Sequence, residues 1–118
     1  MNKIYYLSAC STCQKIIKEL GINEQNFLIQ DIKTTKITLK ELDEMKKLSG
    51  NYETLFSRVA MKYRSMGLNE MKLGENDYKK YILEEYTFLK RPVMIINGKI
   101  FIGNSKKNVE AAKAELKK

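Results

Sequence analysis

Two cysteines near the start of the chain have the types and the spacing for thiol chemistry. They form the C-x-x-C sequence Cys10-Ser11-Thr12-Cys13, which follows a strand-like run and opens a helical pattern. The N–H groups and positive potential of a helix N-terminus favour a thiolate, so we expect a lowered pKa and a nucleophilic sulfur at Cys10. Cys13 lies one turn later on the same face, where its thiol can attack a mixed disulfide. Two buried small side chains, or half of a metal site, are the alternative interpretations.

The composition restricts how such a thiol can be activated. The 118 residues include no histidine and only these two cysteines. Ser-His-Asp and Cys-His catalysis and every zinc site that needs histidine are therefore excluded, and two cysteines cannot complete a four-cysteine zinc site. Any activation of Cys10 must come from backbone dipoles and cations. We expect neither a bound cofactor nor a metal.

The net charge of +8 raises the question of an anionic partner. It comes from 22 cationic residues, of which only Arg58, Arg64 and Arg91 are arginines. Because nucleic-acid readers usually rely on arginine, scattered lysines on solvated faces are the plainer explanation, and we expect no direct nucleic-acid binding. The field still attracts small anions. The apolar runs are too short to span a membrane and no secretory signal follows Met1, so we expect a cytoplasmic protein with reduced thiols.

The elements expected around the C-x-x-C form a β-α-β unit. The apolar runs Lys3–Ser8 and Asn26–Asp31 are predicted strands, and the pattern Gln14–Leu20 between them is a predicted helix. Because only about one helix separates them, the two strands are expected to be parallel, with a right-handed crossover. The chain ends with a predicted hairpin, formed by Pro92–Ile96 and Lys99–Ile102, and a last helix.

The middle of the chain is predicted to be helical. Thr38 begins a capping box ahead of one helix, and Tyr52–Met66 and Glu75–Tyr86 carry the apolar spacing of two more. We expect these helices to form an insertion, at about residues 34–88, in a single domain that spans residues 1–118. The whole order, β-α-β, helices and then β-β-α, predicts an α/β (α+β) chain with the thioredoxin-like fold and a four-stranded mixed sheet.

Pro92 is the one proline of the chain, and it follows Arg91 at the start of the third predicted strand. In a thioredoxin-like fold the proline at this point is usually cis and packs across from the reactive cysteine; a trans proline that opens an edge strand is the alternative. This placement holds Arg91 beside the Cys10 loop, where a guanidinium can bind a tetrahedral oxyanion through two hydrogen bonds. A surface arginine without a ligand is the competing interpretation.

Three stretches of the chain, YYLSACSTC, LFSRVAMKYRSMGL and FLKRPVMIINGKIFIGNSK, resemble the arsenate reductase (ArsC) family, which also contains the Spx transcription regulators. The resemblance covers nearly the whole length. It implies that Cys10 attacks arsenate, and that Ser11 and Thr12 offer the oxyanion a helix N-terminus. Arg91 matches the family's oxyanion-binding arginine before the proline. The resemblance also implies that Cys13 or an external thiol resolves the intermediate, with glutathione and glutaredoxin or thioredoxin as the reductant.

The chain departs from the family pattern at several oxyanion-binding positions. Gln14 stands where an arginine commonly follows the thiol motif, and Asn104 replaces an arginine after the last strand. Arg58 lies within one residue of another family arginine, but the best alignment places Ser57 there. Arg58 and Asn104 are therefore candidate oxyanion ligands beside Arg91. Each lost charge-assisted hydrogen bond is worth about 1.5–3 kcal/mol, which weakens the expectation of efficient arsenate turnover.

Three functions are compatible with these features. The first is a cytoplasmic thiol oxidoreductase that acts on arsenate, a related oxyanion or a thiol adduct, with Cys10 as nucleophile and Arg91 neutralising charge. The second is an Spx-like regulator that binds RNA polymerase and uses Cys10 and Cys13 as a redox switch; the C-x-x-C and the missing arginines favour it. The third is a redox-inert relative, for which an ordinary pKa at Cys10 would be the evidence.

Overall fold

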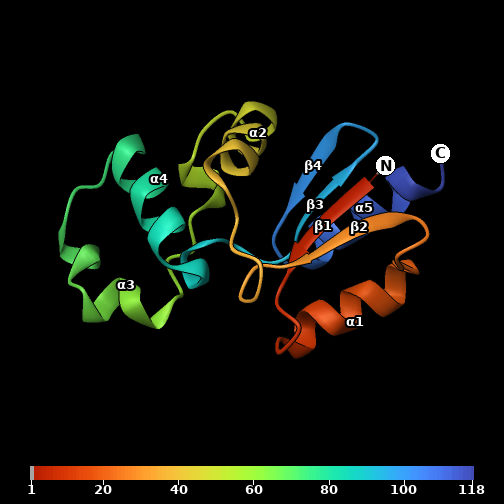
Figure 1. Cartoon of the computed structure of the whole chain (residues 1–118), viewed down its shortest axis with the longest axis horizontal. Helices are drawn as coiled ribbons and strands as arrows, with labels where there is room; N and C mark the ends of the chain where they lie inside the picture. Colours follow the sequence, from red (N-terminus) through yellow and green to blue (C-terminus); the bar gives the residue numbers. More distant parts are fainter. Residues whose placement is uncertain (1) are drawn as a thin grey trace. The chain divides into compact units, whose positions relative to one another are not determined.

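A mixed sheet of four strands, in the order β2-β1-β3-β4, carries the segment that holds the two cysteines (Figure 1). The computed structural model describes residues 2–118. The strands are β1 (Asn2–Tyr6), β2 (Phe27–Asp31), β3 (Val93–Ile96) and β4 (Lys99–Ile102). β1 and β2 are parallel, and β3 pairs antiparallel with both β1 and β4. The predicted mixed sheet of the thioredoxin-like fold is therefore confirmed.

The chain divides into two compact units. The sheet unit comprises the residues up to Lys36 together with Arg91–Lys118, and the helical unit comprises Ile37–Lys90. The sheet unit contains the helices α1 (Ser11–Leu20) and α5 (Lys106–Leu116). The helical unit contains α2 (Leu39–Ser49), α3 (Met61–Ser65), α4 (Glu75–Glu84) and the short 3₁₀ turns Glu53–Leu55, Leu68–Glu70 and Tyr86–Phe88. A single domain for the whole chain stays a prediction.

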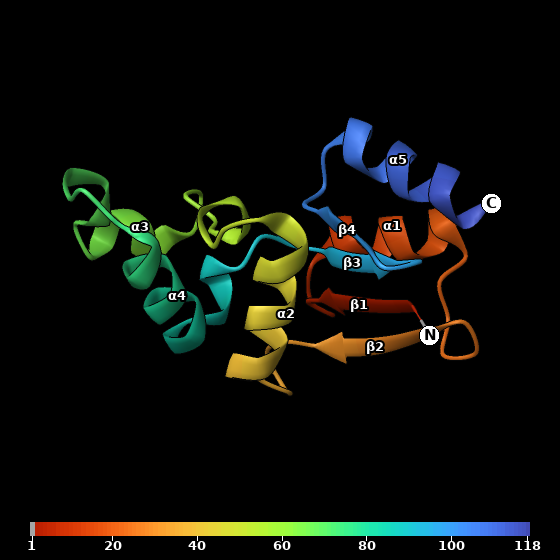
Figure 2. The same ribbon diagram turned by 90° about the horizontal axis from the view of Figure 1, so that it is seen from above.

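The core of the sheet unit lies between the sheet and its two helices. Ile4 of β1 and Met94 of β3 are opposite each other in the antiparallel register and are completely buried. Ile16 of α1 and Val109 and Ala112 of α5 pack in the same cluster, so both helices cover the same face of the sheet. Figure 2 shows α1 and α5 running in the same direction. Their N-termini therefore lie at the same end of the sheet unit.

Two local sequence signals, a helix cap and a hairpin turn, give the structures that they predict. Thr38 caps α2 in a capping box, because its side chain accepts from the backbone N–H of Glu41 while the Glu41 carboxylate accepts from the Thr38 N–H. Asn97 and Gly98 both have positive φ, 53° and 77°, as the tight turn between β3 and β4 requires. No helix within residues 2–118 is long and apolar enough to cross a membrane.

The predicted helix Tyr52–Met66 is wrong, because this segment is interrupted. Phe56 is extended and forms an isolated antiparallel bridge with Leu89. The backbone N–H of Ser57 donates to the Phe88 carbonyl at 2.7 Å, and the N–H of Lys90 donates to the Leu55 carbonyl at 2.9 Å. These hydrogen bonds between distant segments satisfy the backbone groups that a continuous helix would have paired locally. Helix resumes only at α3.

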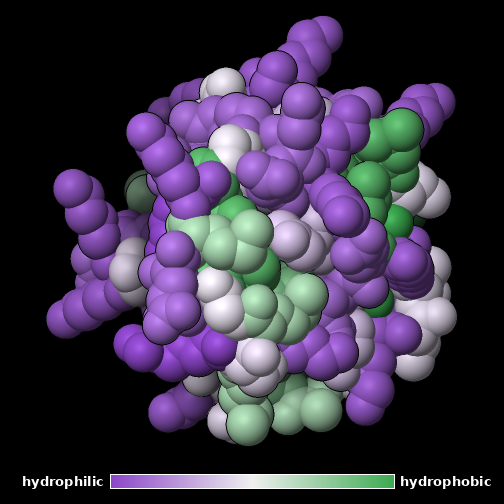
Figure 3. All heavy atoms as spheres, turned by 90° about the vertical axis from the view of Figure 1, so that its left-hand side faces the viewer, coloured by the Kyte–Doolittle hydropathy of each residue, from purple (hydrophilic) through white to green (hydrophobic). Residues whose placement is uncertain are grey.

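Hydrophobic side chains also lie on the surface of the helical unit. Val59, one of the apolar residues on which the predicted helix depended, is 90% exposed, as is Met61. Met66 and Met71 are about half exposed. Figure 3 shows hydrophobic patches among hydrophilic residues on the side of the molecule where α3 and α4 lie. Because the predicted helix is interrupted at Phe56, some of its apolar side chains are exposed to solvent instead of packing in the core.

Candidate functional site

Cys10 lies at the junction between β1 and α1, where the chain turns from strand to helix. It is the N-cap residue of α1 and has extended backbone angles, with φ −89° and ψ 111°. Its backbone N–H donates to the Leu7 carbonyl at 3.1 Å, and its carbonyl accepts the first helical bond from Gln14 at 3.1 Å. The Cys10 side chain is half-buried. The fold therefore presents its sulfur at the N-terminus of a helix.

The surroundings of Cys10 favour its thiolate. Burial by itself raises the pKa of this thiol, but four other contributions lower it. They are hydrogen bonds from the backbone N–H of Cys13, from the Cys13 thiol and from the backbone N–H of Thr12, and the positive charge of Arg91. Together they hold the pKa of Cys10 below its ordinary value. This is the direction predicted for a nucleophilic cysteine, and it counts against the redox-inert alternative.

Cys13 has the opposite character. Its side chain is completely buried in the first turn of α1. Burial raises the pKa of its thiol to about 11, and the hydrogen bond to Cys10 and the Cys10 charge act in the same direction. Both cysteines are free thiols in the structure. The two thiols therefore differ: the pKa of Cys10 is lowered, whereas Cys13 keeps its proton and donates it in a hydrogen bond to the Cys10 sulfur.

A hydrogen-bond chain that the sequence analysis missed supports the cysteine loop from the end of β2. The Ser8 hydroxyl donates to the Asp31 carboxylate at 2.6 Å, and the Gln14 side-chain amide donates to the Ser8 carbonyl at 2.8 Å. The Ser8 hydrogen bond lowers the pKa of Asp31, with a further contribution from the backbone N–H of Lys33. A signal for this contact existed, because Asp31 ends a predicted strand parallel to the one before Cys10.

Arg91 and Pro92 open the segment that leads into β3. The Arg91–Pro92 peptide bond is cis, the isomer that the sequence predicts at this place. Pro92 is buried, and its carbonyl accepts from the backbone N–H of Gly103 at 2.8 Å. Arg91 is half-buried, and its charge lowers the pKa of both cysteine thiols. The structure therefore brings Arg91 near Cys10 and Cys13, and the catalytic role of the three residues stays a prediction.

Replacing Arg91 by glutamine is expected to raise the pKa of Cys10. The substitution removes a positive charge that stabilises the thiolate, so a higher pH is needed to form it. The pH dependence of thiolate ultraviolet absorbance, measured in a Cys13→Ser background, gives this pKa directly. Lys90→Gln is the matched control, because it removes the same charge from the preceding position, which is not among the main causes of the Cys10 shift. Equal pKa values in the two variants would contradict the assigned role of Arg91.

The other predicted oxyanion ligands of the sheet unit lie around the same helix N-terminus. Ser11 and Thr12 are exposed in the first turn of α1, and the Thr12 N–H already points at the Cys10 sulfur. Asn104 is exposed in the turn between β4 and α5 and lines a groove together with Thr12. The turn is fixed by a hydrogen bond from the Asn108 amide to the Gly103 carbonyl at 2.8 Å. Ser11, Thr12 and Asn104 therefore offer uncharged polar groups around this helix N-terminus, and Arg91 supplies a positive charge.

Comparison with known proteins identifies the family. The model of the ArsC family matches residues 5–112, which is nearly the whole chain. The chain belongs to the ArsC family. Its relatives include both kinds of protein that the sequence resembles. An arsenate reductase of Neisseria meningitidis is 24% identical, and the match covers 84% of this chain and 89% of the relative. The global transcriptional regulator Spx 2 of Bacillus anthracis is 25% identical, and the match covers 87% of this chain and 79% of the relative.

Solved structures support the fold of this ArsC-family chain. The YFFB protein superposes with a TM-score of 0.79 at 22% identity, and the match covers 98% of this chain and 99% of that protein. At this identity the match establishes the fold alone. The thioredoxin-like architecture predicted from the order of elements is therefore confirmed, and the helical insertion is part of what is shared.

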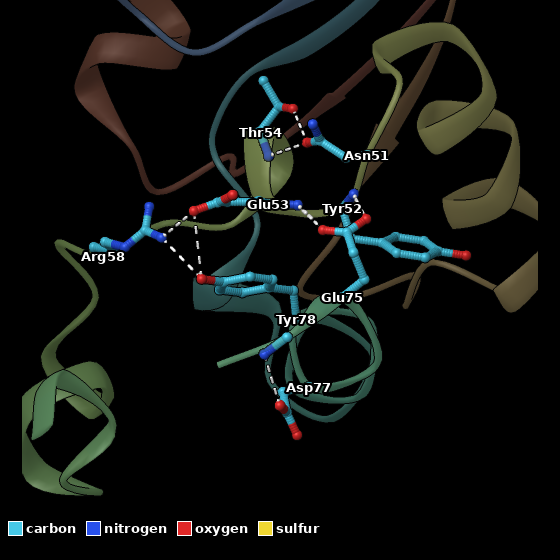
Figure 4. Close-up of polar contacts among 9 residues, drawn as sticks. Asn51, Tyr52, Glu53, Thr54, Arg58, Glu75, Asp77 and Tyr78 are labelled. Carbon is cyan, nitrogen blue, oxygen red and sulfur yellow. Dashed lines mark hydrogen bonds and ion pairs between the residues drawn. The ribbon is translucent and has the colours of Figure 1, made fainter. Parts of the chain in front are cut away.

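Arg58 lies in the helical unit of this ArsC-family chain, and its side chain is engaged there (Figure 4). Its guanidinium donates to the Glu53 carboxylate at 2.8 Å and to the Tyr78 hydroxyl at 2.9 Å. Glu53 is itself held by Glu75, which accepts from the backbone N–H groups of Tyr52 and Glu53 at 2.7 and 3.1 Å. An oxyanion bound by Arg58 would have to compete with Glu53, so this role stays a prediction.

Metal binding finds no support in the described part of the ArsC-family chain. Residues 2–118 contain no group of three or more cysteine, histidine, aspartate or glutamate side chains placed to hold an ion.

Proposed function

We propose that this ArsC-family chain is a thiol-dependent oxidoreductase in which Cys10 attacks an oxyanion such as arsenate, or a thiol adduct. The observation that carries the proposal is the contrast within the cysteine pair: the pKa of Cys10 is lowered while that of Cys13 is raised to about 11. Such a contrast is what a nucleophile and a protonated second thiol require. The arsenate reductase relative supports the oxyanion as substrate.

The proposed reaction begins with the Cys10 thiolate. Its sulfur forms a bond to the arsenic of arsenate, and one arsenate oxygen leaves as water after taking up protons. Arg91 lies beside both thiols and would neutralise the charge of the bound oxyanion, while the N-terminus of α1 offers N–H groups and a positive potential. No imidazole is available, so protons come from the solvent or from the thiol of Cys13.

A second thiolate completes the proposed reaction. It attacks the Cys10 sulfur, the sulfur–arsenic bond breaks, and the electron pair of that bond stays on arsenic, which leaves as arsenite. The two thiols lose two electrons and become one disulfide. If Cys13 is the second thiol, the product is a Cys10–Cys13 disulfide for thioredoxin or glutaredoxin to reduce; if glutathione is, the product is a mixed disulfide on Cys10. A cytoplasmic location, where thiols are kept reduced, suits both routes.

An NADPH-coupled assay with arsenate tests this function. One arm supplies glutathione, glutaredoxin and glutathione reductase, and the other supplies thioredoxin and thioredoxin reductase. Arsenate-dependent NADPH consumption in either arm is the expected result and names the reductant at the same time. The Cys10→Ser variant is the control for background reduction. No arsenate-dependent consumption in either arm would overturn the proposal.

A second candidate is an Spx-like regulator that binds RNA polymerase. The observations that support it are the direct hydrogen bond between the thiols of Cys10 and Cys13 and the Spx 2 relative. Co-purification with RNA polymerase under oxidising but not reducing conditions would support this alternative. Oxidation-dependent binding that persists in the Cys13→Ser variant would contradict it.

A further inference from the structure

A tight turn brings Cys10 from the end of β1 to the start of α1. It spans residues 7–10 and is closed by the hydrogen bond from the Cys10 N–H to the Leu7 carbonyl at 3.1 Å. Its two central residues, Ser8 and Ala9, are both exposed. A segment with few buried side chains opens readily by local motion, so polar contacts must keep this turn in one conformation. The direction of the Cys10 side chain depends on those contacts.

Two polar contacts hold Ser8, one through its side chain and one through its backbone. Its hydroxyl donates to one oxygen of the Asp31 carboxylate at 2.6 Å, and its carbonyl accepts from the side-chain amide of Gln14 at 2.8 Å. Asp31 is the last residue of β2, and Gln14 lies in the first turn of α1. The turn is therefore tied to the sheet and also to the helix whose N–H groups donate to the Cys10 sulfur.

Asp31 is itself firmly placed. It lies opposite Tyr6 in the parallel register of β1 and β2, and the following N–H, that of Ile32, donates to the Tyr6 carbonyl at 3.0 Å. The second oxygen of the Asp31 carboxylate accepts from the backbone N–H of Lys33 at 3.1 Å. The 2.6 Å contact with the Ser8 hydroxyl has the short distance of a charge-assisted hydrogen bond, which is stronger than a neutral one. Asp31 therefore anchors Ser8 to the end of β2.

The charge of Asp31 cannot by itself favour a thiolate at Cys10. A carboxylate disfavours a second negative charge nearby, so its Coulomb effect raises the pKa of a thiol. Burial also raises the pKa of Cys10, and the contributions that lower it come from the N–H groups at the start of α1, the Cys13 thiol and the charge of Arg91. Any contribution of Asp31 to this thiolate must therefore come from the placement of the turn.

We propose that Asp31 is a positioning residue for Cys10 and acts through Ser8 and Gln14. Its carboxylate holds the turn in the conformation in which the N–H groups at the start of α1 are directed at the Cys10 sulfur. The inference rests on the proposed function for the role of Cys10 as the nucleophile. It also gives a role to Gln14, which stands where an arginine commonly follows the thiol motif: its amide ties the helix to the turn instead of adding a positive charge.

The titration of Cys10 distinguishes placement from charge. In a Cys13→Ser background, thiolate ultraviolet absorbance is followed against pH for Ser8→Ala and for Asp31→Ala. We expect a higher Cys10 pKa in both, and at a pH below that pKa a thiolate fraction roughly threefold lower, because the hydrogen bonds to the thiolate are weakened. If Asp31 acted through its charge alone, Asp31→Ala would lower the pKa. Glu24→Ala is the matched control, since it removes an exposed carboxylate near the other end of β2, and it should leave the pKa unchanged.

Combined substitutions test whether Ser8 and Asp31 act as one unit. Ser8→Ala added to Asp31→Ala should raise the Cys10 pKa no further, because either change alone breaks the same hydrogen bond. Asp31→Asn keeps an oxygen that can accept from the Ser8 hydroxyl, so its effect should be smaller than that of Asp31→Ala. Gln14→Leu should raise the pKa, because it removes the other contact of the turn.

An unchanged or lowered Cys10 pKa in Ser8→Ala or in Asp31→Ala would overturn the inference, as would additive effects in the double variant. Asp31→Ala also loses the contact with the Lys33 N–H, whereas Ser8 is exposed and its replacement leaves that contact in place. Ser8→Ala therefore tests the inference even if Asp31→Ala fails to fold. The titration uses no substrate, so a chain that shows these pKa values but does not reduce arsenate would overturn the proposed function alone.

Discussion

The Cys10→Ser variant is expected to lose arsenate-dependent turnover by roughly 10³-fold or more, because the substitution removes the nucleophile itself. A serine hydroxyl at the same N-cap position is a far weaker nucleophile, and no histidine exists to activate it. The fold should survive, since serine is a favoured N-cap residue and Cys10 is only half-buried. The measurement is the NADPH-coupled assay with whichever reductant the parent protein uses.

Alkylation separates the two thiols independently of any substrate. The lowered pKa of Cys10 gives it a larger thiolate fraction at pH 7 than an ordinary cysteine has, whereas a pKa of about 11 leaves only about one Cys13 in 10⁴ ionised. Iodoacetamide is therefore expected to modify the parent protein once, at Cys10, as counted by mass spectrometry. The rate should follow the thiolate fraction, with a midpoint below the ordinary pKa of a cysteine. Cys10→Ser should remain unmodified over the same time.

The Cys13→Ser variant is the matched comparison. It should keep fast alkylation at Cys10, somewhat slowed because one hydrogen bond to the thiolate is changed. Its turnover identifies the resolving thiol: loss in the thioredoxin arm indicates the internal route, and retention in the glutathione arm indicates the external one. If Cys10→Ser retained the turnover of the parent protein, or if Cys13 were alkylated as fast as Cys10, the assignment of the nucleophile would be wrong.

Those parts of the fold that depend on neighbouring residues were predictable from the sequence. The strands are short apolar runs between turn residues, and Asn97 and Gly98 form the tight turn of the hairpin. The segment after Tyr52 was not predictable in the same way. Its course depends on the bridge between Phe56 and Leu89, residues that are far apart in the chain, and no local pattern reports such a partner. The pairing of Phe56 with the distant Leu89 therefore determines the backbone of this segment, although its apolar residues have helical spacing.

In the candidate site, too, the features set by neighbouring residues were predictable and those set by distant residues were not. Cys10, Cys13 and Arg91 were predictable because each occupies a recognisable place: a helix N-terminus for the cysteines, and the residue before the one proline for the arginine. The hydrogen bond between Ser8 and Asp31 depends on the parallel register of β1 and β2, which the sequence suggests only coarsely. The ion pair of Arg58 with Glu53 depends on the irregular backbone between them and could not be anticipated.

Replacing Phe56 by alanine is expected to lower the free energy of unfolding by about 3–5 kcal/mol. Phe56 is completely buried at the centre of an aromatic cluster in the helical unit, with ring centroids 5.1 Å from Phe88, 4.9 Å from Tyr78 and 5.9 Å from Tyr63. The substitution removes these contacts and leaves a cavity in a core that can close only partly. The total free energy of unfolding of a small protein is about 5–15 kcal/mol, so this loss is a large fraction of the stability. Urea unfolding followed by circular dichroism measures it.

Val59→Ala is the control, because the Val59 side chain is 90% exposed, and it should change stability by less than about 0.5 kcal/mol. Hydrogen exchange then shows how far the damage extends. If residues 1–118 form one cooperative domain, Phe56→Ala lowers protection in β3 of the sheet unit as much as in α4 of the helical unit. A loss confined to residues 37–90 would mean that the helical unit opens alone, and the single-domain prediction would be wrong. Equal stability of the two variants would instead contradict the assignment of Phe56 to the core.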